Sequence, residues 1–388
     1  MTQAPAVRPS IPPERFAERL DRAAAAASQH GVDALLIGVG PDLRYLTGYE
    51  AMPLERLTML VVVPGEPPVI VVPRLEQAAA EAGLRTPVRI LIWDETDDPH
   101  ALVARHIGAS SIRNGTTVAV SDTLWASHLL ELQRTLDPAT GFQVASTVLR
   151  DLRMIKDADE IGLLRLAAEA ADRVVAQIAA GRLVGRTEHD VAAEVRARLI
   201  AEGHDQALFA IVASGPHSAS PHHDASTRVI GAGEPVVLDI GGVLGGYGSD
   251  ITRTLWVTGG DAANGPDEAF RHLFAVLYHA QATATAAVRP GVPCEAIDRA
   301  ARDLIDAEGY GERFFHRTGH GIGLEGHEDP YLVAGNTLPL REGMAFSVEP
   351  GIYFAGEYGA RIEDIVVCGP GGPLVLNAVP RELLVVDG

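Results

Sequence analysis

Apolar positions recur at helical and at strand spacing in alternation through the first part of the chain. Phe16, Leu20 and Ala24 are spaced as the buried face of an amphipathic helix. Residues 31–39 (GVDALLIGV) then form a short apolar run typical of a buried strand, and residues 41–49 (PDLRYLTGY) are expected to form a turn. Helix and strand signals therefore follow one another from the start of the chain.

The same alternation continues to about residue 150. Residues 57–64 (LTMLVVVP) and 68–73 (PVIVVP) are apolar runs joined by Gly-Glu-Pro, which predicts a hairpin. A short helix is expected to end at Gly83. Further apolar runs predict two strands and then a helix, at residues 88–94, 116–121 and 123–136. We therefore predict that residues 1–150 form an α/β domain.

The pattern changes after residue 150. A long amphipathic helix is expected after Asp157, which can cap it because Glu160 occupies the capping-box position, and Thr187 opens a second helix. From Leu208 onward, strand-like runs surround two further predicted helices, at residues 267–288 and 294–308. The last predicted strands fall at residues 344–354, 360–368 and 383–387. Residues 151–388 are therefore predicted to form an α+β domain with antiparallel strand pairs.

Composition narrows the class of protein. A chain of 388 residues with 47% hydrophobic side chains fits two domains with substantial cores. The formal net charge of −19 argues against nucleic acid or an anionic membrane as a partner. Lys156 is the only lysine, which we interpret as compositional bias, and Cys294 and Cys368 lack the spacing of a zinc or disulfide framework. No secretion signal or membrane-spanning run is recognisable, so a cytoplasmic protein is expected.

Candidate chemistry is concentrated in the second domain. Four carboxylates and one imidazole each lie beside glycine or threonine and close to an apolar run: Asp239 (VVLDIGG), Asp250 (YGSDITRT), His320 (HRTGHGIG), Glu349 (SVEPGIY) and Glu363 (ARIEDIVV). Oxygen ligands with one histidine are the set expected for two divalent cations that share carboxylates. The sequence therefore predicts hydrolysis by metal-activated water. The alternative is that these are ordinary surface acids at strand ends.

Two glycine-containing hairpins would bring the carboxylates together. Asp239 and Asp250 are joined by GGVLGGYGS, which should place both at one end of a β-ribbon, and Thr252 should share the face of Asp250. A second hairpin around FAGEYGA should do the same for Glu349 and Glu363. Carboxylates gathered without cations would raise one another's pKa, so a pair of divalent ions would stabilise the arrangement.

The histidines need a separate interpretation. His316 and His320 could share one helical face, but the glycines around His320 favour a loop. Residues 321–326 match the dinucleotide-binding pattern GxGxxG, yet no βαβ unit surrounds them, so that interpretation is set aside. Three more histidines, His217, His222 and His223, follow an apolar run and could belong to an active site.

Together these motifs resemble the pita-bread metallopeptidases (family M24), which include Xaa-Pro dipeptidase (prolidase) and aminopeptidase P. The resemblance covers nearly the whole chain: GVDALLI, LRYLTGY and LTMLVVVP are similar to the creatinase/prolidase N-terminal domain, and MIKDADEIGLLRLAAEAAD is similar to the opening of the catalytic domain. It implies an α/β creatinase/prolidase-type domain over residues 1–150. It also implies an α+β pita-bread catalytic domain over residues 151–388.

The resemblance also implies roles for the candidate residues. Asp239 would bind one metal ion bidentately, Asp250 and Glu363 would bridge two ions, and His320 and Glu349 would complete the other shell. Glu349 would also accept the proton of the attacking water. His222 and His327 match positions that orient substrate and stabilise the tetrahedral intermediate. His316 and Arg361 match positions that contact the ligands or the substrate, and Thr252 adjoins them. Many members have asparagine at the position of His217, and for His223 we expect a core or surface role.

The implied function is hydrolysis of Xaa-Pro bonds in small peptides, with a dipeptide as the first expected substrate. Aminopeptidase P activity on longer peptides and a non-peptide C–N hydrolase related to ectoine hydrolase are the alternatives, and a binding module that has lost activity is a third class. The ligand set admits manganese, cobalt, zinc or iron, with manganese as the first choice. A homodimer is expected by family precedent.

Overall fold

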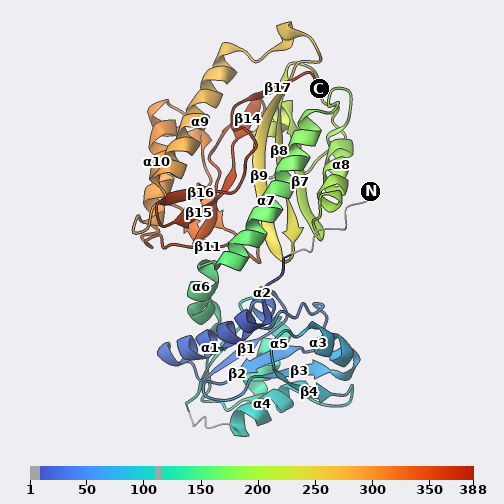
Figure 1. The fold of residues 1–388 in the computed structure, drawn as a ribbon, viewed down its shortest axis with the longest axis vertical. Helices are drawn as coiled ribbons and strands as arrows, with labels where there is room; N and C mark the ends of the chain where they lie inside the picture. Colours follow the sequence, from blue (N-terminus) through green and yellow to red (C-terminus); the bar gives the residue numbers. More distant parts are fainter. Residues whose placement is uncertain (1–8, 110–114) are drawn as a thin grey trace. The chain divides into compact units, whose positions relative to one another are not determined.

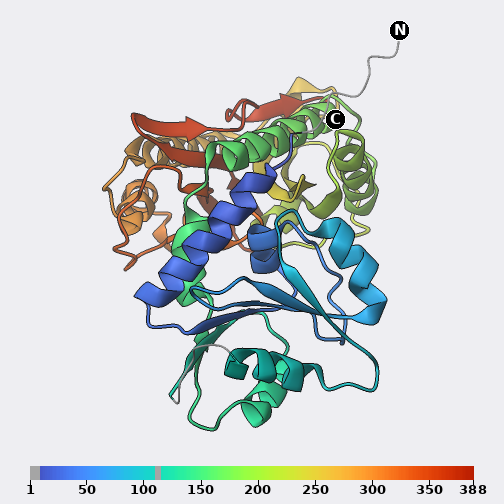
Figure 2. The same ribbon diagram turned by 60° about the horizontal axis from the view of Figure 1, so that its bottom comes forward.

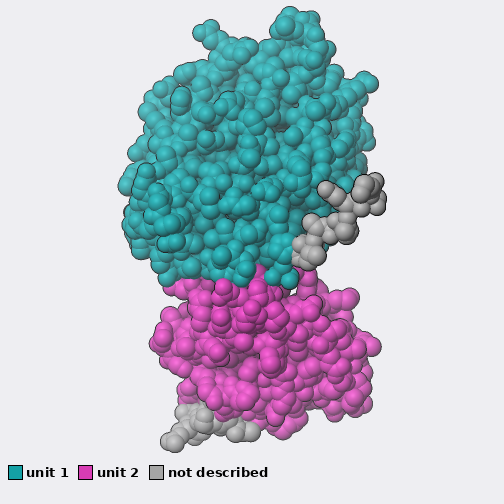
Figure 3. Space-filling view, in the orientation of Figure 1, with its two compact units in different colours: residues 1–10, 154–388 teal, residues 11–153 magenta. Residues whose placement is uncertain are grey.

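The computed structural model describes residues 9–109 and 115–388, which divide into two compact units. One consists of residues 11–153, and the other consists of residues 154–388 together with Pro9 and Ser10 (Figure 3). No helix among these described residues is long and apolar enough to cross a membrane.

The smaller unit is a mixed β-sheet with helices on both faces (Figure 2). Its strands lie in the order β4-β3-β2-β1-β5-β6, and β2 pairs antiparallel with both β1 and β3 while the remaining pairs are parallel. The strands are β1 (Ala34–Ile37), β2 (Met59–Val62), β3 (Val69–Pro73), β4 (Arg89–Trp93), β5 (Thr117–Val120) and β6 (Gly141–Val144). The hairpin predicted at residues 57–73 is confirmed by the β2–β3 pair.

Helices of the smaller unit bury the apolar faces of this sheet. Met59 and Val71 pack in one core with Val103 of α4 and Leu132 of α5. The helices are α1 (Pro13–Gln29), α2 (Pro41–Thr47), α3 (Gln77–Gly83), α4 (Pro99–Ala109), α5 (Ala126–Thr135) and α6 (Ser146–Met154), with a 3-10 turn at Arg74–Glu76 before α3. The helix predicted from the spacing of Phe16 and Leu20 is confirmed as α1.

The prediction of a turn at residues 41–49 is wrong, because residues 41–47 form helix α2. Pro41 suits the first helical position, where its fixed φ is already helical and its missing N–H has no helical acceptor. Gly48 ends the helix with a φ of +76°, a conformation that glycine adopts without strain. A helix of seven residues is too short to show a clear apolar period.

In the larger unit, one helix pair packs on each of two sheets (Figure 1). The first sheet has the order β17-β9-β8-β7 and packs against α7 and α8. Its elements are α7 (Ala158–Ala179), α8 (Glu188–Ala201), β7 (Gln206–Ser214), β8 (Glu234–Leu244), β9 (Tyr247–Val257) and β17 (Leu384–Val386). Leu238, Ile240 and Ile251 belong to the core shared with these helices. Because side chains alternate along a strand, Asp239, which lies between Leu238 and Ile240, points to the opposite face.

The second sheet has the order β11-β10-β12-β15-β16 and packs against α9 and α10. Its elements are α9 (Glu268–Ala287), α10 (Cys294–Ala307), β10 (Gly319–Gly321), β11 (Glu328–Leu332), β12 (Ala345–Val348), β15 (Asp364–Gly369) and β16 (Gly372–Val375). A separate hairpin consists of β13 (Gly351–Phe354) and β14 (Tyr358–Arg361). Short 3-10 turns occur at Gly215–Ala219, Ala262–Asn264 and Gly311–Arg313.

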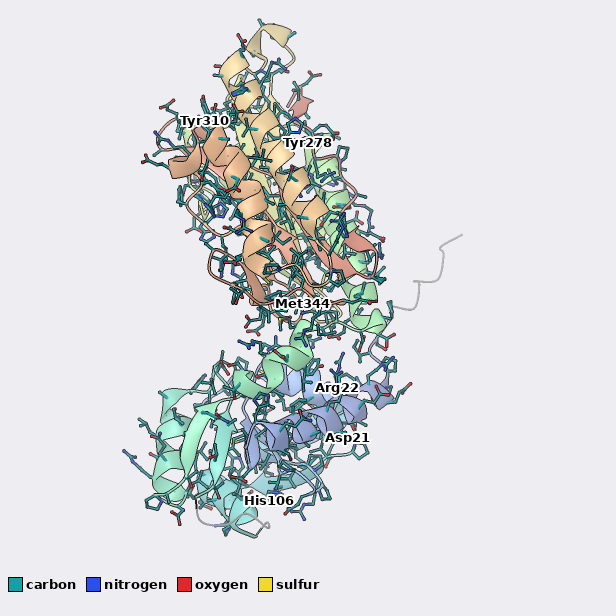
Figure 4. The ribbon with its side chains drawn as sticks, turned by 90° about the vertical axis from the view of Figure 1, so that its left-hand side faces the viewer. Asp21, Arg22, His106, Tyr278, Tyr310 and Met344 are labelled. Atoms are coloured by element: carbon teal, nitrogen blue, oxygen red, sulfur yellow. The ribbon has the colours of Figure 1, made fainter. Side chains whose placement is uncertain are left out.

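The core beneath the second sheet is apolar and continuous. Figure 4 views the molecule from the side of α9 and α10 and labels Tyr278 on α9, Tyr310 just beyond α10, and Met344 before β12. Met344 is buried in this core, and the two tyrosines pack partly buried against it. Phe346 and Val348 of β12 belong to the same core, so Ser347 between them faces away from the helices.

The helix starts predicted from the sequence are confirmed. Asp157 and Glu160 form a reciprocal capping box at α7, with N–H to carboxylate distances of 2.9 Å in both directions. Thr187 accepts a hydrogen bond from the Asp190 N–H at α8, and Asp267 accepts one from the Phe270 N–H at α9. Each cap satisfies a backbone donor that the first helical turn leaves free.

We predict that Asp157→Ala lowers the free energy of unfolding by about 1 kcal/mol, because it removes the side-chain acceptor of the α7 cap. Urea unfolding followed by circular dichroism measures the change. Glu169→Ala, on the exposed side of the same helix, is the matched control and should leave the midpoint nearly unchanged. Equal losses in the two variants would contradict the capping argument.

Candidate metal centre

A tight hairpin aligns the first two carboxylates. β8 and β9 are joined by Gly245 and Gly246, whose φ values of +60° and +94° fit the two-residue turns that glycine favours. In this register Asp239 faces Thr252 and Asp250 faces Gly241. The predicted hairpin is confirmed, but the two aspartates lie in the middle of their strands and not at one end of the ribbon. Two long strands can bury both carboxylates deeply, whereas a ribbon end would expose them.

The second pair of carboxylates flanks the β13–β14 hairpin. Its last pair is Gly351 with Arg361, and Glu349 and Glu363 each lie two residues beyond it. The Glu363 N–H donates to the Thr252 carbonyl (3.1 Å), and the Thr252 hydroxyl donates to Glu363 Oε2 (2.7 Å). These bonds join the two sheets at the carboxylates.

Both long strands predicted at the end of the chain are interrupted at these glutamates. Residues 344–354 divide into β12 and β13 at Glu349-Pro350, and residues 360–368 divide into β14 and β15 at Ile362-Glu363. Pro350 has no N–H to donate, so the ladder of β12 cannot continue through it. The chain instead leaves one sheet for the hairpin and returns.

His320 lies on strand β10, and the predicted loop is wrong. A side chain at Gly319 would overlap the Ser347 carbonyl oxygen, and one at Gly321 would overlap the Asp329 carbonyl. The glycines therefore permit close approach of neighbouring strands and do not provide a turn. Strand β10 pairs with both β11 and β12, which fixes the direction of the imidazole.

The imidazole of His320 presents one nitrogen to the carboxylates. Its Nδ1 lies 3.2 Å from the Gly321 carbonyl, and its Nε2 lies 3.3 Å from Glu349 Oε1 and 3.7 Å from Asp250 Oδ2. A proton on Nδ1, held by the carbonyl, leaves Nε2 free to bind a metal ion. Burial lowers the pKa of His320 to about 3, so the imidazole is neutral at pH 7.

The five predicted ligands form two groups that share Glu363. Asp239, Asp250 and Glu363 offer oxygen atoms that all lie within 4.8 Å of one another, and so do ligand atoms of His320, Glu349 and Glu363. Burial and the neighbouring carboxylates raise the pKa of Asp250 and Glu363 well above their ordinary values. Burial, with repulsion from Asp239, raises that of Glu349 to about 7. Within the described residues, Asp239 Oδ1 is buried and has no hydrogen-bond partner.

These observations fit two divalent cations. A bound cation would cancel the repulsion that raises the carboxylate pKa values and would satisfy the orphaned oxygen of Asp239. Carboxylate oxygens with one imidazole suit manganese, cobalt, iron or zinc. Asp239, Asp250, Glu363, Glu349 and His320 are therefore the residues that would hold them.

Arg361 and Tyr353 form a hydrogen-bond network beside the carboxylates. Arg361 is 2% exposed, and its guanidinium donates to Asp239 Oδ2 (2.6 Å), the Thr252 hydroxyl (3.1 Å) and the Tyr353 hydroxyl (2.8 Å). His316 Nε2 lies 3.0 Å from the same tyrosine hydroxyl, and its Nδ1 lies 2.8 Å from the Arg317 carbonyl. Sequence reasoning missed Tyr353, whose hydroxyl occupies the space that a side chain at Gly351 would fill.

A cavity of about 620 Å³ opens beside the carboxylates. His222 and His327 both line it, and the ring of His327 stacks on that of His320 with 3.7 Å between centroids. Burial lowers the pKa of His327, so its ring is neutral at pH 7. The apolar part of the wall, which sequence reasoning also missed, consists of Phe209, Ile211, Pro221 and Phe315.

Several other predicted features fall outside the cavity. Residues 321–326 connect antiparallel strands β10 and β11, with no helix after them, so the GxGxxG match is not part of a dinucleotide-binding unit. His217 and His223 both contact the buried carboxylate of Glu188. Lys156, interpreted from the sequence as compositional bias, is buried and forms an ion pair with Glu328, the residue after His327.

The fold and the paired ligand groups define a hydrolase of the dinuclear metallopeptidase class. Comparison with known proteins agrees: residues 162–370 match metallopeptidase family M24, and residues 19–155 match the creatinase/prolidase N-terminal domain. The chain belongs to metallopeptidase family M24, with the pita-bread catalytic fold that the sequence implied.

Relatives align over nearly the full chain. "Probable dipeptidase PepE" of Mycobacterium tuberculosis is 46% identical over 380 residues, which are 96% of this chain and 97% of that protein. The Xaa-Pro dipeptidase of Pyrococcus furiosus is 32% identical over 368 residues, covering 95% and 99%. The crystal structure of dipeptidase PepE from Mycobacterium ulcerans superimposes with a TM-score of 0.89 at 46% identity, covering 97% of this chain and 99% of that one.

We predict that Gly319→Ala weakens metal binding, because the new methyl group would push β10 and His320 away from Ser347. Disturbing a group that orients a metal ligand lowers metal affinity by about 10- to 100-fold. Titration with Mn²⁺ measures the change in affinity. Gly326→Ala is the matched control, since a Cβ there meets no atom within 4 Å. Unchanged affinity in Gly319→Ala would show that the close strand approach does not position His320.

Proposed function

We propose that this protein is a dinuclear-metal-dependent exopeptidase that hydrolyses Xaa-Pro bonds, with dipeptides as its substrates. The observation that carries the proposal is the pair of ligand groups sharing Glu363 at one side of a cavity that His222 and His327 also line. The similarity to Xaa-Pro dipeptidases, such as that of Pyrococcus furiosus, supports the choice of bond. A cavity of about 620 Å³ is of a size that accepts a small molecule.

The geometry supports a role for each candidate residue. When bound, a pair of divalent cations supplies Lewis acidity that activates water and polarises the scissile carbonyl. Glu349 borders the cavity and would accept the proton of the attacking water. His222 and His327 would donate hydrogen bonds to the substrate as negative charge develops on its carbonyl oxygen. Arg361, which also lines the cavity, would keep the ligands in place through its hydrogen bonds to Asp239, Thr252 and Tyr353.

Aminopeptidase activity on longer Xaa-Pro peptides is the second candidate. The X-Pro aminopeptidase of Thermotoga maritima superimposes with a TM-score of 0.81 at 29% identity, covering 95% of this chain. The two activities differ in how the residue after proline is accepted. Manganese as the metal, a homodimeric assembly and a cytoplasmic location remain predictions from the sequence. Activity assays of protein loaded with one metal at a time would test the metal, and light scattering would test the homodimer.

We predict that the metal-loaded protein hydrolyses Ala-Pro faster than Ala-Pro-Ala and leaves ectoine unchanged. Initial rates with a panel of Ala-Pro, Ala-Pro-Ala, Ala-Ala and ectoine measure the preference. Turnover of the tripeptide alone would replace the dipeptidase proposal with the aminopeptidase one. Turnover of ectoine alone would place the reaction outside peptide hydrolysis.

We further predict that Asp250→Asn lowers both metal content and kcat/KM. The amide of asparagine cannot replace the charge of the carboxylate. Mutating even the outer partners of metal ligands lowers affinity or activity by about 10- to 100-fold, so we expect kcat/KM to fall by at least about 10²-fold. Elemental analysis and initial rates measure the two effects. Asp303→Asn makes the same change on the exposed side of α10 and should affect neither quantity. Full activity in metal-depleted wild-type protein would reject the metal-dependent mechanism.

A further inference from the structure

A buried carboxylate outside the metal centre lies behind the segment that carries His222. Glu188 is the first residue of α8, and its side chain is 0% exposed. It accepts hydrogen bonds from the N–H and hydroxyl of Ser214, both at 2.8 Å, and from the N–H and hydroxyl of Ser226, at 3.1 and 2.7 Å. The two serines are the first and last residues of the segment 214–226, so one carboxylate holds both of its ends.

Two histidines of the same segment complete this contact. His223 Nε2 lies 2.8 Å from Glu188 Oε2, and His217 Nδ1 lies 3.0 Å from Oε1. Their rings also contact each other, with centroids 4.3 Å apart. The segment is therefore tied to Glu188 at four positions along its length, which gives His217 and His223 a role that their sequence context did not reveal.

The charge of Glu188 strengthens these ties. Burial by itself would raise its pKa, but the hydrogen bonds from Ser214, Ser226 and His223 lower the pKa to about 2. Glu188 is therefore ionised at neutral pH, and hydrogen bonds to an ionised acceptor are about twice as strong as neutral ones. Removing the acceptor would leave several donors of the segment without a partner.

The opposite side of the segment faces the metal centre. His222, directly before His223, lines the cavity, and the Pro221 carbonyl accepts a hydrogen bond from Arg361 (3.2 Å). The Ser218 hydroxyl accepts another from the Gly359 N–H (2.8 Å). The segment thus lies between Glu188 on one side and the β13–β14 hairpin on the other.

We propose that Glu188 is a positioning residue: by holding segment 214–226 through Ser214, His217, His223 and Ser226, it sets the position of the His222 imidazole in the cavity. The inference rests on the proposed function, in which His222 contacts the substrate. Glu188 is not among the residues that line the cavity, and it lies outside the two groups of predicted metal ligands.

Glu188→Gln tests this with almost no change in volume. Because an ångström of misplacement costs about 10²-fold in rate, kcat/KM for Ala-Pro should fall by about that factor while the metal content stays at the wild-type value. Glu194→Gln is the matched control: it lies on the same helix, where it pairs at the surface with Arg186 and Arg198. Loss of metal in Glu188→Gln would overturn the proposal, because the effect would then run through the metal centre.

A double-mutant cycle separates positioning from general stability. If Glu188 acts through His222, then Glu188→Gln in a His222→Ala background should change kcat/KM by no more than about twofold, the ordinary limit of additivity errors. An undiminished loss in that background would overturn the proposal. Should Glu188→Gln fail to fold, His223→Asn removes a single donor and enters the same cycle, with the exposed His189→Asn as its control.

Hydrogen exchange provides a readout that does not depend on activity. Amides of segment 214–226 should exchange faster in Glu188→Gln and at the wild-type rate in Glu194→Gln. If the wild-type protein turns over none of the Xaa-Pro substrates, the proposed function fails, but exchange still tests the anchor. Unchanged exchange in Glu188→Gln would overturn the anchor even if the protein is an active Xaa-Pro dipeptidase.

Discussion

The mutual repulsion of four closely grouped carboxylates is the constraint on which the rest of the larger unit depends. Asp239, Asp250 and Glu363 are buried, Glu349 is partly buried, and all four line the cavity. Within each of the two ligand groups, the ligand atoms lie within 4.8 Å of one another. Arg361 supplies one compensating charge, bound to Asp239. One guanidinium cannot neutralise four carboxylates, so the arrangement is stable only with cations or with protons. Two divalent ions balance the charge while leaving every carboxylate ionised.

Strand geometry meets this constraint without strain. Each sheet uses one face for a hydrophobic core with its helices, and alternation then directs Asp239, Asp250 and Thr252 to the other face. A slip of one residue in the β8–β9 register would exchange the two sets and bury the carboxylates among leucine and isoleucine side chains. The hydrophobic cores therefore determine the ligand geometry as much as the turns do.

The sequence was sufficient for the features that are encoded locally. Caps at Asp157 and Thr187, the two hairpins and the five grouped side chains each depend on residues within one short signature. It failed where a long-range contact decides the conformation. The glycines beside His320 indicated a loop, whereas they allow strands from residues 329 and 347 to approach. The roles of Glu188 and Tyr353 likewise come from partners distant in the chain, which no local pattern displays.

A related distinction separates the candidate metal ligands from His222 and His327. Asp239, Asp250 and His320 lie on strands, where backbone ladders hold them, whereas His222 lies in a connecting segment and His327 is the last residue before β11. Such segments need side-chain anchors to hold an imidazole in one place. Lys156 pairs with Glu328 next to His327, and Gly323 leaves room for this pair, because a Cβ there would crowd both partners. Glu188 likewise pairs with His223, the residue after His222. Each of the two cavity histidines therefore has a chain neighbour that pairs with a buried charged side chain: Glu328 with Lys156, and His223 with Glu188.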